Sequence, residues 1–361
     1  MHHCIVIGGG LIGMLTAREL AAEGIRVTLL EQGRVGRESS WAGGGIISPL
    51  YPWRYDSSVT ALAKWGQQHY PQLATSLRKE GKIDPEYTKS GLLILEPEDI
   101  EDAIDWGRQT KQSIVTLGKP GINDCEPALT TASSQAIWLP EVAQIRNPRL
   151  TKAAYQAIKN RVQIRENTTV SGFEVKAGRL QGIRVDSSVL PADQAVVCAG
   201  AWTGKLLKNF VTRPTIEPVL GQMILFRAQP GQISRIVLHE DRYVIPRRDG
   251  RVLVGSTLEH RGFDKSTTEQ AKQTLQAYAL ARFHSLREAV VEHHWAGLRP
   301  GSPSGIPYIG QVPEVEGLYL NSGHFRNGVV LGPASARLIS DIILGRSPIL
   351  PPEPYALNSP R

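Results

Sequence analysis

Three glycines near the start of the chain have the spacing that binds the phosphates of a dinucleotide. Gly8, Gly10 and Gly13 follow the G-x-G-x-x-G pattern directly after a short apolar run at residues 4–7. In this pattern one glycine permits a tight turn, one lets the backbone approach a pyrophosphate, and one allows close packing of a helix on a strand. The chemistry expected here is the binding of a nucleotide cofactor by backbone N–H groups and the positive end of a helix.

The residues around these glycines predict the elements that position them. Residues 4–7 are too few for a helix and predict a buried strand, and the Leu- and Ala-rich run that follows predicts a helix ending at Gly24. Residues 26–31 predict a second strand. It ends in Glu31, whose carboxylate would accept hydrogen bonds from a ribose diol and would repel a 2′-phosphate. The alternative is a glycine-rich turn in an ordinary α/β protein.

Composition and charge exclude several classes of protein. The 361 residues contain no apolar run near the roughly 20 residues that a membrane span needs. The three cysteines, Cys4, Cys125 and Cys198, are too scattered for a disulfide framework or a metal site. A strand that starts at residue 4 leaves no room for a signal peptide, so a cytoplasmic location is expected. The net charge is +7, but its densest basic cluster, residues 247–251, contains an Asp-Gly pair and predicts a solvated hairpin tip rather than a nucleic-acid patch.

Three further segments could bring backbone against the same ligand. Residues 32–46 form a second glycine-dense loop, and residues 199–202 join a buried strand to a helix start through small side chains. Residues 323–328 form a third such loop. It precedes a helix expected at residues 329–344, whose first N–H groups would also be available to a ligand.

Together these segments resemble the D-amino-acid-oxidase-like family of FAD-dependent oxidoreductases. The resemblance is carried by four segments and covers nearly the whole chain: Gly8-Gly9-Gly10 with Glu31, Ala199-Gly200-Ala201-Trp202, Gly297-Leu298-Arg299-Pro300 and Gly323-His324-Phe325-Arg326-Asn327-Gly328. It implies FAD as cofactor and a homotetramer. Some relatives attach their flavin to a cysteine after the arginine strand, but residues 301–306 contain none, so noncovalent FAD is expected.

The resemblance also implies the roles of individual residues. Arg299 would bind the substrate carboxylate, Tyr243 would lie beside it, and Arg326 would lie at the boundary of flavin and substrate. Leu258 stands where a family member has a methionine near the substrate. The glycine motif, the backbone segments above and the resemblance together predict these cofactor-binding residues: Gly8, Gly10, Leu11, Ile12, Gly13, Glu31, Gln32, Ser39, Ser40, Gly44, Gly45, Ile46, Val170, Ala199, Gly200, His324, Phe325, Arg326, Asn327, Gly328, Val329 and Val330.

The activity implied by the resemblance is oxidative deamination of a small amino acid. Glycine, water and O2 would give glyoxylate, ammonia and hydrogen peroxide, with hydride passing from Cα to flavin N5, and the product would feed thiazole formation for thiamine. A planar arginine fork such as Arg299 can fix a carboxylate in one orientation. His324 is expected to pack against the flavin rather than to act as a base. Neighbouring His293 and His294 would face opposite sides of a strand and form no metal pair.

Several alternatives stay open at this stage. A D-amino acid or sarcosine dehydrogenase or oxidase that passes electrons to another acceptor would carry the same residues. The FAD domain of a tRNA-modifying protein would normally be joined to a methyltransferase half, for which a chain ending at residue 361 has no room. A non-catalytic flavin subunit is disfavoured because Arg299, Tyr243 and Arg326 are present together.

The predicted fold class is α/β (α+β), with a Rossmann-like FAD-binding domain and an antiparallel-sheet substrate domain. Strands alternate with helices early in the chain, whereas strands from residue 217 onward follow one another without helices. Residues 98–117 are expected to form one amphipathic helix. The predicted FAD-binding domain comprises residues 1–85, 140–215 and 297–361, and the substrate domain comprises residues 86–139 and 216–296.

Overall fold

Strand β1 lies inside a six-stranded sheet that carries the first glycine turn at its end. The computed structural model describes residues 2–361. The strand order of this sheet is β18-β19-β12-β1-β2-β8, and all neighbours are parallel except β18 and β19. Its strands are β1 (His3–Ile7), β2 (Arg26–Leu30), β8 (Gln163–Arg165), β12 (Gln194–Val197), β18 (Tyr308–Gln311) and β19 (Leu318–Ser322).

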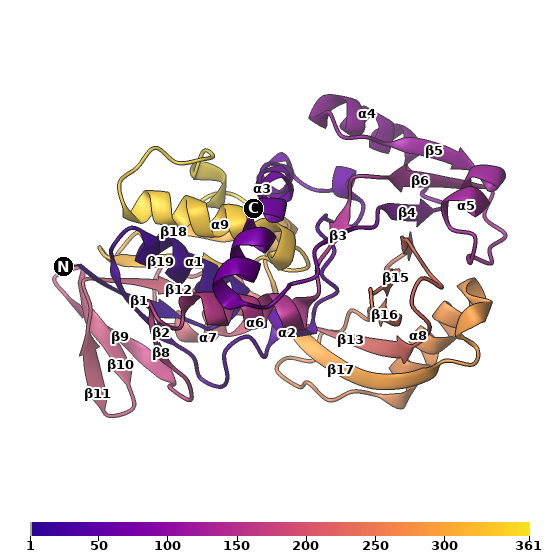
Figure 1. Ribbon diagram of the computed structural model, residues 1–361. Helices are drawn as coiled ribbons and strands as arrows, with labels where there is room; N and C mark the ends of the chain where they lie inside the picture. The colour runs from indigo at the N-terminus through magenta and orange to yellow at the C-terminus, as the bar shows by residue number, and fades with distance from the viewer. Residues whose placement is uncertain (1) are drawn as a thin grey trace.

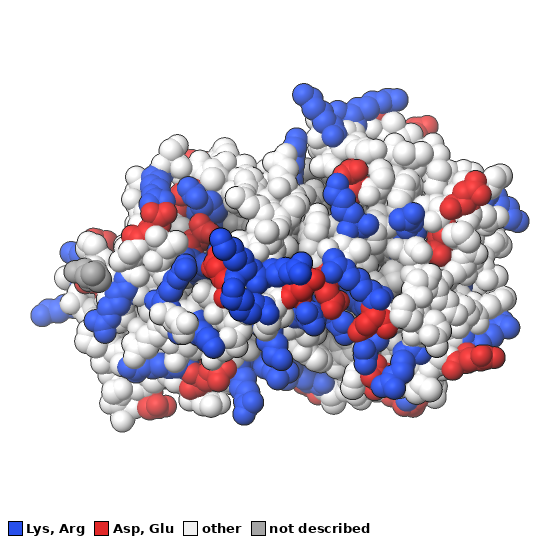
Figure 2. Space-filling view, in the orientation of Figure 1, with Lys and Arg blue, Asp and Glu red and all other residues white. Residues whose placement is uncertain are grey.

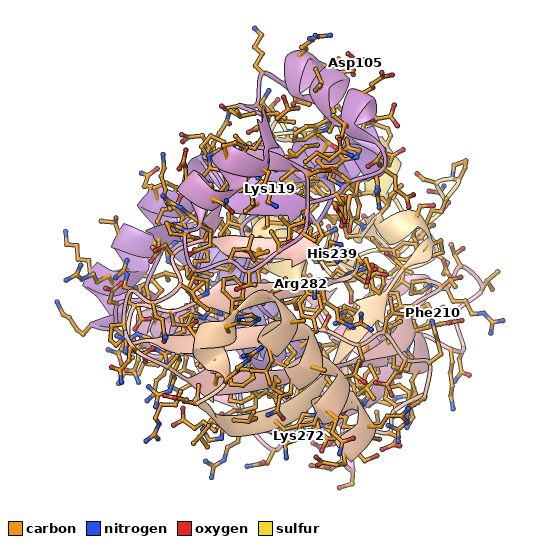
Figure 3. The ribbon with its side chains drawn as sticks, turned by 90° about the vertical axis from the view of Figure 1, so that its right-hand side faces the viewer. Asp105, Lys119, Phe210, His239, Lys272 and Arg282 are labelled. Atoms are coloured by element: carbon orange, nitrogen blue, oxygen red, sulfur yellow. The ribbon has the colours of Figure 1, made fainter. Side chains whose placement is uncertain are left out.

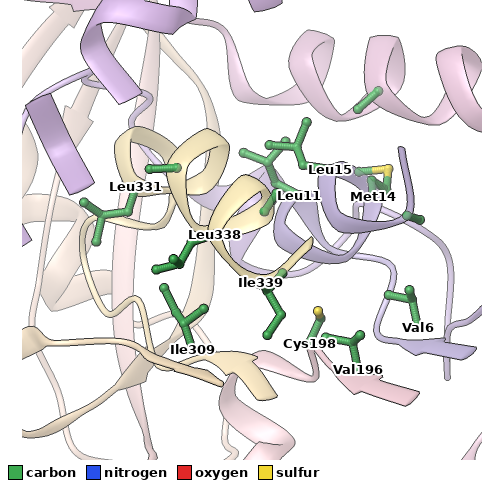
Figure 4. Close-up of a cluster of buried hydrophobic side chains, with 14 of the residues drawn as sticks. Val6, Leu11, Met14, Leu15, Val196, Cys198, Ile309, Leu331, Leu338 and Ile339 are labelled. Atoms are coloured by element: carbon green, nitrogen blue, oxygen red, sulfur yellow. The ribbon is translucent and has the colours of Figure 1, made fainter. Parts of the chain in front are cut away.

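A layer of helices covers one face of this sheet (Figure 1). In Figure 4, Leu11, Met14 and Leu15 lie near Leu331 and Leu338 on the neighbouring helix, in one cluster of buried apolar side chains. Burial of such apolar surface is the main favourable term in folding, so this cluster fixes the helices on the sheet. The helices are α1 (Leu11–Ala22), α3 (Ser57–Gly81), α6 (Asn147–Ile158) and α9 (Gly328–Ile343).

A small three-stranded sheet packs near the other face of the first sheet. Phe173 and Ile183 from this small sheet share a buried cluster with Ile5 and Ile7 of β1. Its strands, in the order β11-β10-β9, are β9 (Val170–Lys176), β10 (Arg179–Val185) and β11 (Ser188–Pro191). The short helix α7 (Thr203–Leu206) follows β12.

The second large sheet has eight strands in the order β17-β13-β16-β15-β14-β4-β6-β5 and is antiparallel except for the β14–β4 pair. Figure 3 shows α8 (Glu269–Arg282) with Arg282 at the end near His239, and these two side chains lie 2.6 Å apart. The strands are β4 (Leu92–Leu95), β5 (Val115–Gly118), β6 (Gln135–Leu139), β13 (Glu217–Arg227), β14 (Ile236–His239), β15 (Arg242–Pro246), β16 (Arg251–Gly255) and β17 (Val290–Gly301). The remaining α-helices here are α4 (Ile100–Thr110) and α5 (Lys119–Cys125).

The predicted mixed α/β class is confirmed, but one predicted helix is wrong. Residues 98–117 do not form a single helix, because α4 ends at Thr110, where Lys111 adopts a left-handed conformation with φ 58°. Val115 and Thr116 then belong to β5, which pairs with β6. β-Branched side chains favour a strand, and this preference outweighs the helical periodicity there. The proposed division into two domains stays a prediction, and β17 crosses its boundary at residue 297.

On the face shown in Figure 2, basic residues are spread among acidic ones. The expected solvated hairpin tip at residues 247–251 is only partly found. Arg248 is exposed, but Arg247 is only 7% exposed. Within residues 2–361, no helix combines the length and the apolar character needed to cross a membrane, and no cluster of His, Cys, Asp and Glu could hold a metal ion.

Candidate active site

A cavity of about 590 Å³ joins the glycine turn of the first sheet to three strands of the second. It is lined by Gly8 and Glu31 from the first sheet and by Met223, Tyr243 and Arg299 from β13, β15 and β17. All residues predicted above to bind cofactor or substrate line this cavity except Gly13, Val330 and Leu258. The structure therefore gathers residues from distant parts of the chain, while their binding roles stay predictions.

The glycine turn has the close backbone approach that its spacing predicts. Gly8 has φ +109°, and a Cβ there would lie 2.4 Å from the carbonyl oxygen of Cys198. A Cβ on Gly13 would lie 1.9 Å from the carbonyl oxygen of Gly8. Gly13 therefore lets α1 pack on β1 and does not itself reach the cavity. Val330 is likewise buried in helix packing, where its carbonyl lies close to Gly66 of α3.

Glu31 is held at the cavity wall by two backbone N–H groups. Its carboxylate accepts hydrogen bonds from Gly9 N and from Gly33 N, both at 2.8 Å. A carboxylate that is fixed in this way keeps further lone pairs for another donor, such as a hydroxyl of a ribose. The geometry is compatible with the role predicted for the acid at the end of β2.

The second glycine loop is tied to α1 and to a buried arginine. Ser40, in the short helix α2 (Ser39–Ala42), accepts a hydrogen bond from Leu11 N at 2.8 Å. Arg247 donates to the carbonyl oxygen of Gly44 at 2.6 Å, and also to the carbonyl oxygen of Ile145 at 3.1 Å and to Oε1 of Gln144 at 2.7 Å. Burial lowers the pKa of Arg247 to about 10. Within the described chain no carboxylate lies within ion-pair distance of this guanidinium, so its ligands are neutral oxygens.

Arg299 is a second arginine, partly buried, without an acidic partner among residues 2–361. Its guanidinium donates to the carbonyl oxygens of Leu220 and Thr257, each at 3.2 Å, and to Oγ of Ser256 at 2.7 Å. Burial lowers its pKa from the ordinary arginine value, with Tyr243 opposing this change. Because arginine stays protonated in proteins, the cavity contains a positive charge that an anionic ligand would neutralise.

Tyr243 and Arg326 complete the cluster around Arg299. The hydroxyl of Tyr243 packs against the second glycine loop, and a Cβ on Gly44 would lie 3.2 Å from that oxygen. Arg326 lies in the loop before α9, and its Nη1 is 3.6 Å from Oδ1 of Asp241. The positive charge of Arg326 also lowers the pKa of Arg299, so the two guanidinium groups are electrostatically coupled.

The loop before α9 presents a neutral histidine and the positive end of a 16-residue helix to the cavity. His324 Nε2 lies 2.9 Å from Oγ of Ser335, and this hydroxyl donates to the carbonyl oxygen of Leu331. His324 therefore donates through Nε2–H. Burial lowers the pKa of His324 to about 3, so the ring is neutral at physiological pH.

The residues present fit FAD. The N-termini of α1 and α9 point positive charge at the cavity. Beside them, glycines leave space that an added Cβ atom would fill. Together these features suit a pyrophosphate and a flavin ring. Two buried polar atoms of cavity-lining residues, Asn321 Oδ1 and Asn327 Nδ2, have no hydrogen-bond partner in the described part of the protein. Buried polar groups normally have a partner, so these two atoms are exceptions in the wall of the cavity.

Sequence reasoning missed some cavity residues and misplaced another. Gly221, Met223 and Ser256 line the cavity, but they lie in strands or strand ends without a motif. Leu258, expected near the substrate, is 49% exposed and lies outside the cavity lining. Leu258 does not reach the cavity because it lies beyond the end of β16. The methionine that does line the cavity is Met223, which lies inside β13 with its side chain buried.

Comparisons with known proteins identify a family model and several similar proteins. The family model described as DAO, FAD dependent oxidoreductase, matches residues 3–342. A glycine oxidase of Pseudomonas putida KT2440 is 49% identical over 355 residues, covering 98% of this chain and 97% of that protein. The bifunctional protein ThiO/ThiG of Synechocystis sp. PCC 6803 is 31% identical over 356 residues, covering 96% of this chain and 52% of that protein. A crystal structure of glycine oxidase from Geobacillus kaustophilus has 26% identity and a TM-score of 0.93, with 100% of both chains covered.

Proposed function

The chain belongs to the DAO family of FAD-dependent oxidoreductases, and we propose that it oxidises glycine and other small amines or D-amino acids. With glycine, the products are glyoxylate, ammonia and hydrogen peroxide, formed from the substrate, water and O2. The similarity to a glycine oxidase at 49% identity over nearly the full chain supports this substrate. The similarity to ThiO/ThiG supports a link to thiamine biosynthesis.

The observation that carries the proposal is the position of Arg299. Its partly buried positive charge is held by the carbonyl oxygens of Leu220 and Thr257 and by Ser256 rather than by an acid. Backbone oxygens orient the fork without neutralising it. A carboxylate entering the cavity would gain charge-assisted hydrogen bonds there, and Tyr243 lies close enough to add one from its phenol.

The protein residues have few further tasks in this reaction. When bound, FAD accepts the hydride from the substrate Cα. Arg299 and Tyr243 fix the carboxylate, and with it the Cα–H bond, in one orientation. The N-terminus of α9 stabilises negative charge that develops next to it. His324 donates to Ser335 and its lowered pKa makes it a weak base, so we expect solvent rather than His324 to take the proton of the substrate amine.

Four finer features belong to the same proposal. FAD is bound noncovalently, since residues 301–306, the segment after the arginine strand, contain no cysteine. O2 is the electron acceptor, the protein acts in the cytoplasm, and the active assembly is a homotetramer. A dehydrogenase with another acceptor is the competing function.

The test starts from the purified protein and its visible spectrum. We expect a yellow protein whose absorbance is bleached by glycine under anaerobic conditions and restored by air with formation of one peroxide per glyoxylate. A screen of glycine, sarcosine and D-alanine then ranks the substrates. Bleaching without restoration by air would favour the dehydrogenase, and a colourless protein that FAD does not reconstitute would contradict the proposal.

A further inference from the structure

We propose that Glu259 is a positioning residue for the substrate: through Thr257 it holds the backbone that fixes the guanidinium of Arg299. This inference deepens the proposed function and rests on it, because it takes Arg299 as the group that binds the substrate carboxylate. Glu259 does not line the cavity, so it acts on the substrate only through the residues between them.

The segment at residues 256–259 supplies two of the groups that hold Arg299. The guanidinium donates to Oγ of Ser256 at 2.7 Å and to the carbonyl oxygen of Thr257 at 3.2 Å. A further acceptor, the carbonyl oxygen of Leu220, belongs to β13. The segment follows the end of β16, so contacts outside that strand must keep it in place.

Glu259 ties this segment to β13 with both its backbone and its side chain. Its N–H donates to the carbonyl oxygen of Leu220 at 3.0 Å, and its own carbonyl oxygen accepts from Leu220 N at 2.9 Å. Its Oε1 accepts from Oγ1 of Thr257 at 2.5 Å and from Nε2 of Gln222 at 2.8 Å. The Thr257 hydroxyl also accepts from Gln222 N at 2.9 Å. The carboxylate therefore fixes the side chain of the residue whose carbonyl oxygen binds Arg299.

Gln222 makes this arrangement rigid, because it is fully buried and both ends of its amide have partners. Its Oε1 accepts from Thr268 N at 2.9 Å and lies 3.1 Å from Nε2 of His294, and its Nε2 donates to Glu259 and, at 3.3 Å, to Oγ1 of Thr268. A satisfied buried network is rigid, whereas loss of one member leaves its neighbours unsatisfied. Without the Glu259 carboxylate, the Thr257 hydroxyl and the Gln222 amide both lose an acceptor.

The effect of Glu259 on Arg299 is expected to depend on geometry rather than on charge. Burial raises the pKa of Glu259, but hydrogen bonds from Thr257 and Gln222 and the charge of Arg261 lower it overall, so the carboxylate is ionised at neutral pH. Both of these hydrogen bonds go to Oε1, whereas Oε2 faces Nη1 of Arg261 at 3.6 Å. A neutral amide of the same shape can keep both bonds with its carbonyl oxygen. Aspartate, which is one methylene shorter, moves its oxygens away from both donors.

The test measures how tightly the FAD-loaded enzyme binds acetate, from the change that acetate causes in the visible flavin spectrum. Acetate has the carboxylate of glycine without the amine, so it is not oxidised. We expect Glu259→Ala and Glu259→Asp to raise the acetate Kd and the KM for glycine roughly 5- to 20-fold, because the groups that hold the guanidinium lose their anchor. The kcat should change less than KM, and the FAD dissociation constant should stay within twofold. Glu259→Gln should recover most of the loss.

Glu292→Ala is the matched control. Glu292 is also a partly buried glutamate of this sheet, and it pairs with two arginines. It lies at the opposite end of β17 from Arg299. Its removal should lower the stability of the protein and leave the acetate Kd within twofold of the parent.

Thr257→Val tests the path from Glu259 to Arg299. It removes the hydroxyl and keeps the backbone carbonyl, so the acetate Kd should rise by about the same factor as in Glu259→Ala. Because both changes break the same chain of contacts, the double variant should bind acetate about as well as either single variant. If Glu259→Ala does not fold, Thr257→Val decides alone, and an unchanged acetate Kd in it overturns the inference.

Two further results would overturn the inference. One is a folded Glu259→Ala variant whose acetate Kd equals that of the parent. The other is recovery by Glu259→Asp but not by Glu259→Gln, which would show that charge rather than position matters. A flavin-loaded parent that neither binds acetate nor oxidises glycine would instead contradict the proposed function.

Discussion

The guanidinium of Arg299 lies directly against Gly221 on the neighbouring strand, at a place where no side chain fits. A Cβ added to Gly221 would lie 2.2 Å from Nη2 and 2.4 Å from Cζ of Arg299. Gly221 pairs with Gly297 in the β13–β17 ladder, and Arg299 follows Gly297 by two positions on the same face. The slot above Gly221 therefore determines where the positive charge sits in the cavity.

Gly221→Ala is expected to impair substrate binding without loss of FAD. The added methyl group must displace the guanidinium, and a shift of about 1 Å in a positioning group can cost roughly 100-fold in rate. We expect kcat/KM for glycine to fall about 10- to 100-fold, while the FAD dissociation constant stays within twofold. Gly118→Ala is the control, because a Cβ there meets its nearest atom only at 4.0 Å. An unchanged kcat/KM in Gly221→Ala would show that the slot does not matter.

Arg299→Ala should keep FAD and lose most of the affinity for the substrate carboxylate. Removal of a charge-assisted, bidentate contact costs about 2–4 kcal/mol, which corresponds to an increase in KM of roughly 30- to 1000-fold. Arg299→Lys should recover only part of this loss, since an ammonium lacks the planar fork. Steady-state kinetics with glycine and fluorescence titration with FAD measure the two effects separately. An unchanged KM in Arg299→Ala would refute the assignment of Arg299.

Arg247→Gln is expected to weaken FAD binding. The variant leaves the carbonyl oxygens of Gly44 and Ile145 without their buried donor, and each unsatisfied group costs about 1–3 kcal/mol. The glycine loop that lines the cavity then loses its anchor, so the FAD dissociation constant should rise at least tenfold. Arg248→Gln changes the exposed neighbour and should leave FAD affinity within twofold. Equal affinities in the two variants would contradict a positioning role for Arg247.

The sequence predicts the parts of the cavity that local geometry determines. The glycine turn, Glu31 at the end of β2 and the loop before α9 are each set by residues close in sequence, and all of them line the cavity. Gly221 and Arg247 carry no such signal. Their importance depends on which strands become neighbours: β13 beside β17, and the β15–β16 hairpin against residues 144–145.

The two wrong predictions, for the helix at residues 98–117 and for the exposure of Arg247, also arise because distant segments decide the structure there. Helical periodicity in residues 98–117 does not reveal that Lys111 turns left-handed or that β5 finds a partner in β6. The turn at Asp249 and Gly250 depends only on residues close in sequence. The burial of Arg247 beside it depends on the glycine loop of a distant segment, whose carbonyl oxygen it binds.

Glu31→Ala should reduce FAD affinity more than it changes turnover of the loaded enzyme. The carboxylate now satisfies Gly9 N and Gly33 N and is proposed to bind the ribose, so its loss removes an acceptor from both N–H groups. We expect the FAD dissociation constant to rise at least tenfold and kcat at saturating FAD to stay within threefold. Glu31→Gln keeps the shape and one acceptor oxygen and should lie between parent and Ala variant. Equal FAD affinity in parent and Glu31→Ala would exclude the ribose role.

The pH dependence separates the role of His324 from that of the substrate amine. Burial lowers the pKa of His324 to about 3, so the ring does not titrate between pH 5 and 10. We therefore expect kcat/KM for glycine to rise with pH until the substrate amine is neutral, with the same midpoint in parent and His324→Gln. A midpoint that moves by more than half a pH unit in the variant would identify His324 as the titrating group.

The same lowered pKa predicts how stability depends on pH. In the unfolded chain the ring of His324 binds a proton near pH 6.5, whereas in the folded protein it does so only near pH 3. The unfolded state therefore binds more protons between these values, and stability decreases as pH falls from about 6.5 toward 3. His324→Gln should make this decrease shallower, which urea unfolding at pH 7 and pH 5 measures directly. An equal loss of stability in parent and variant would show that the decrease comes from other groups.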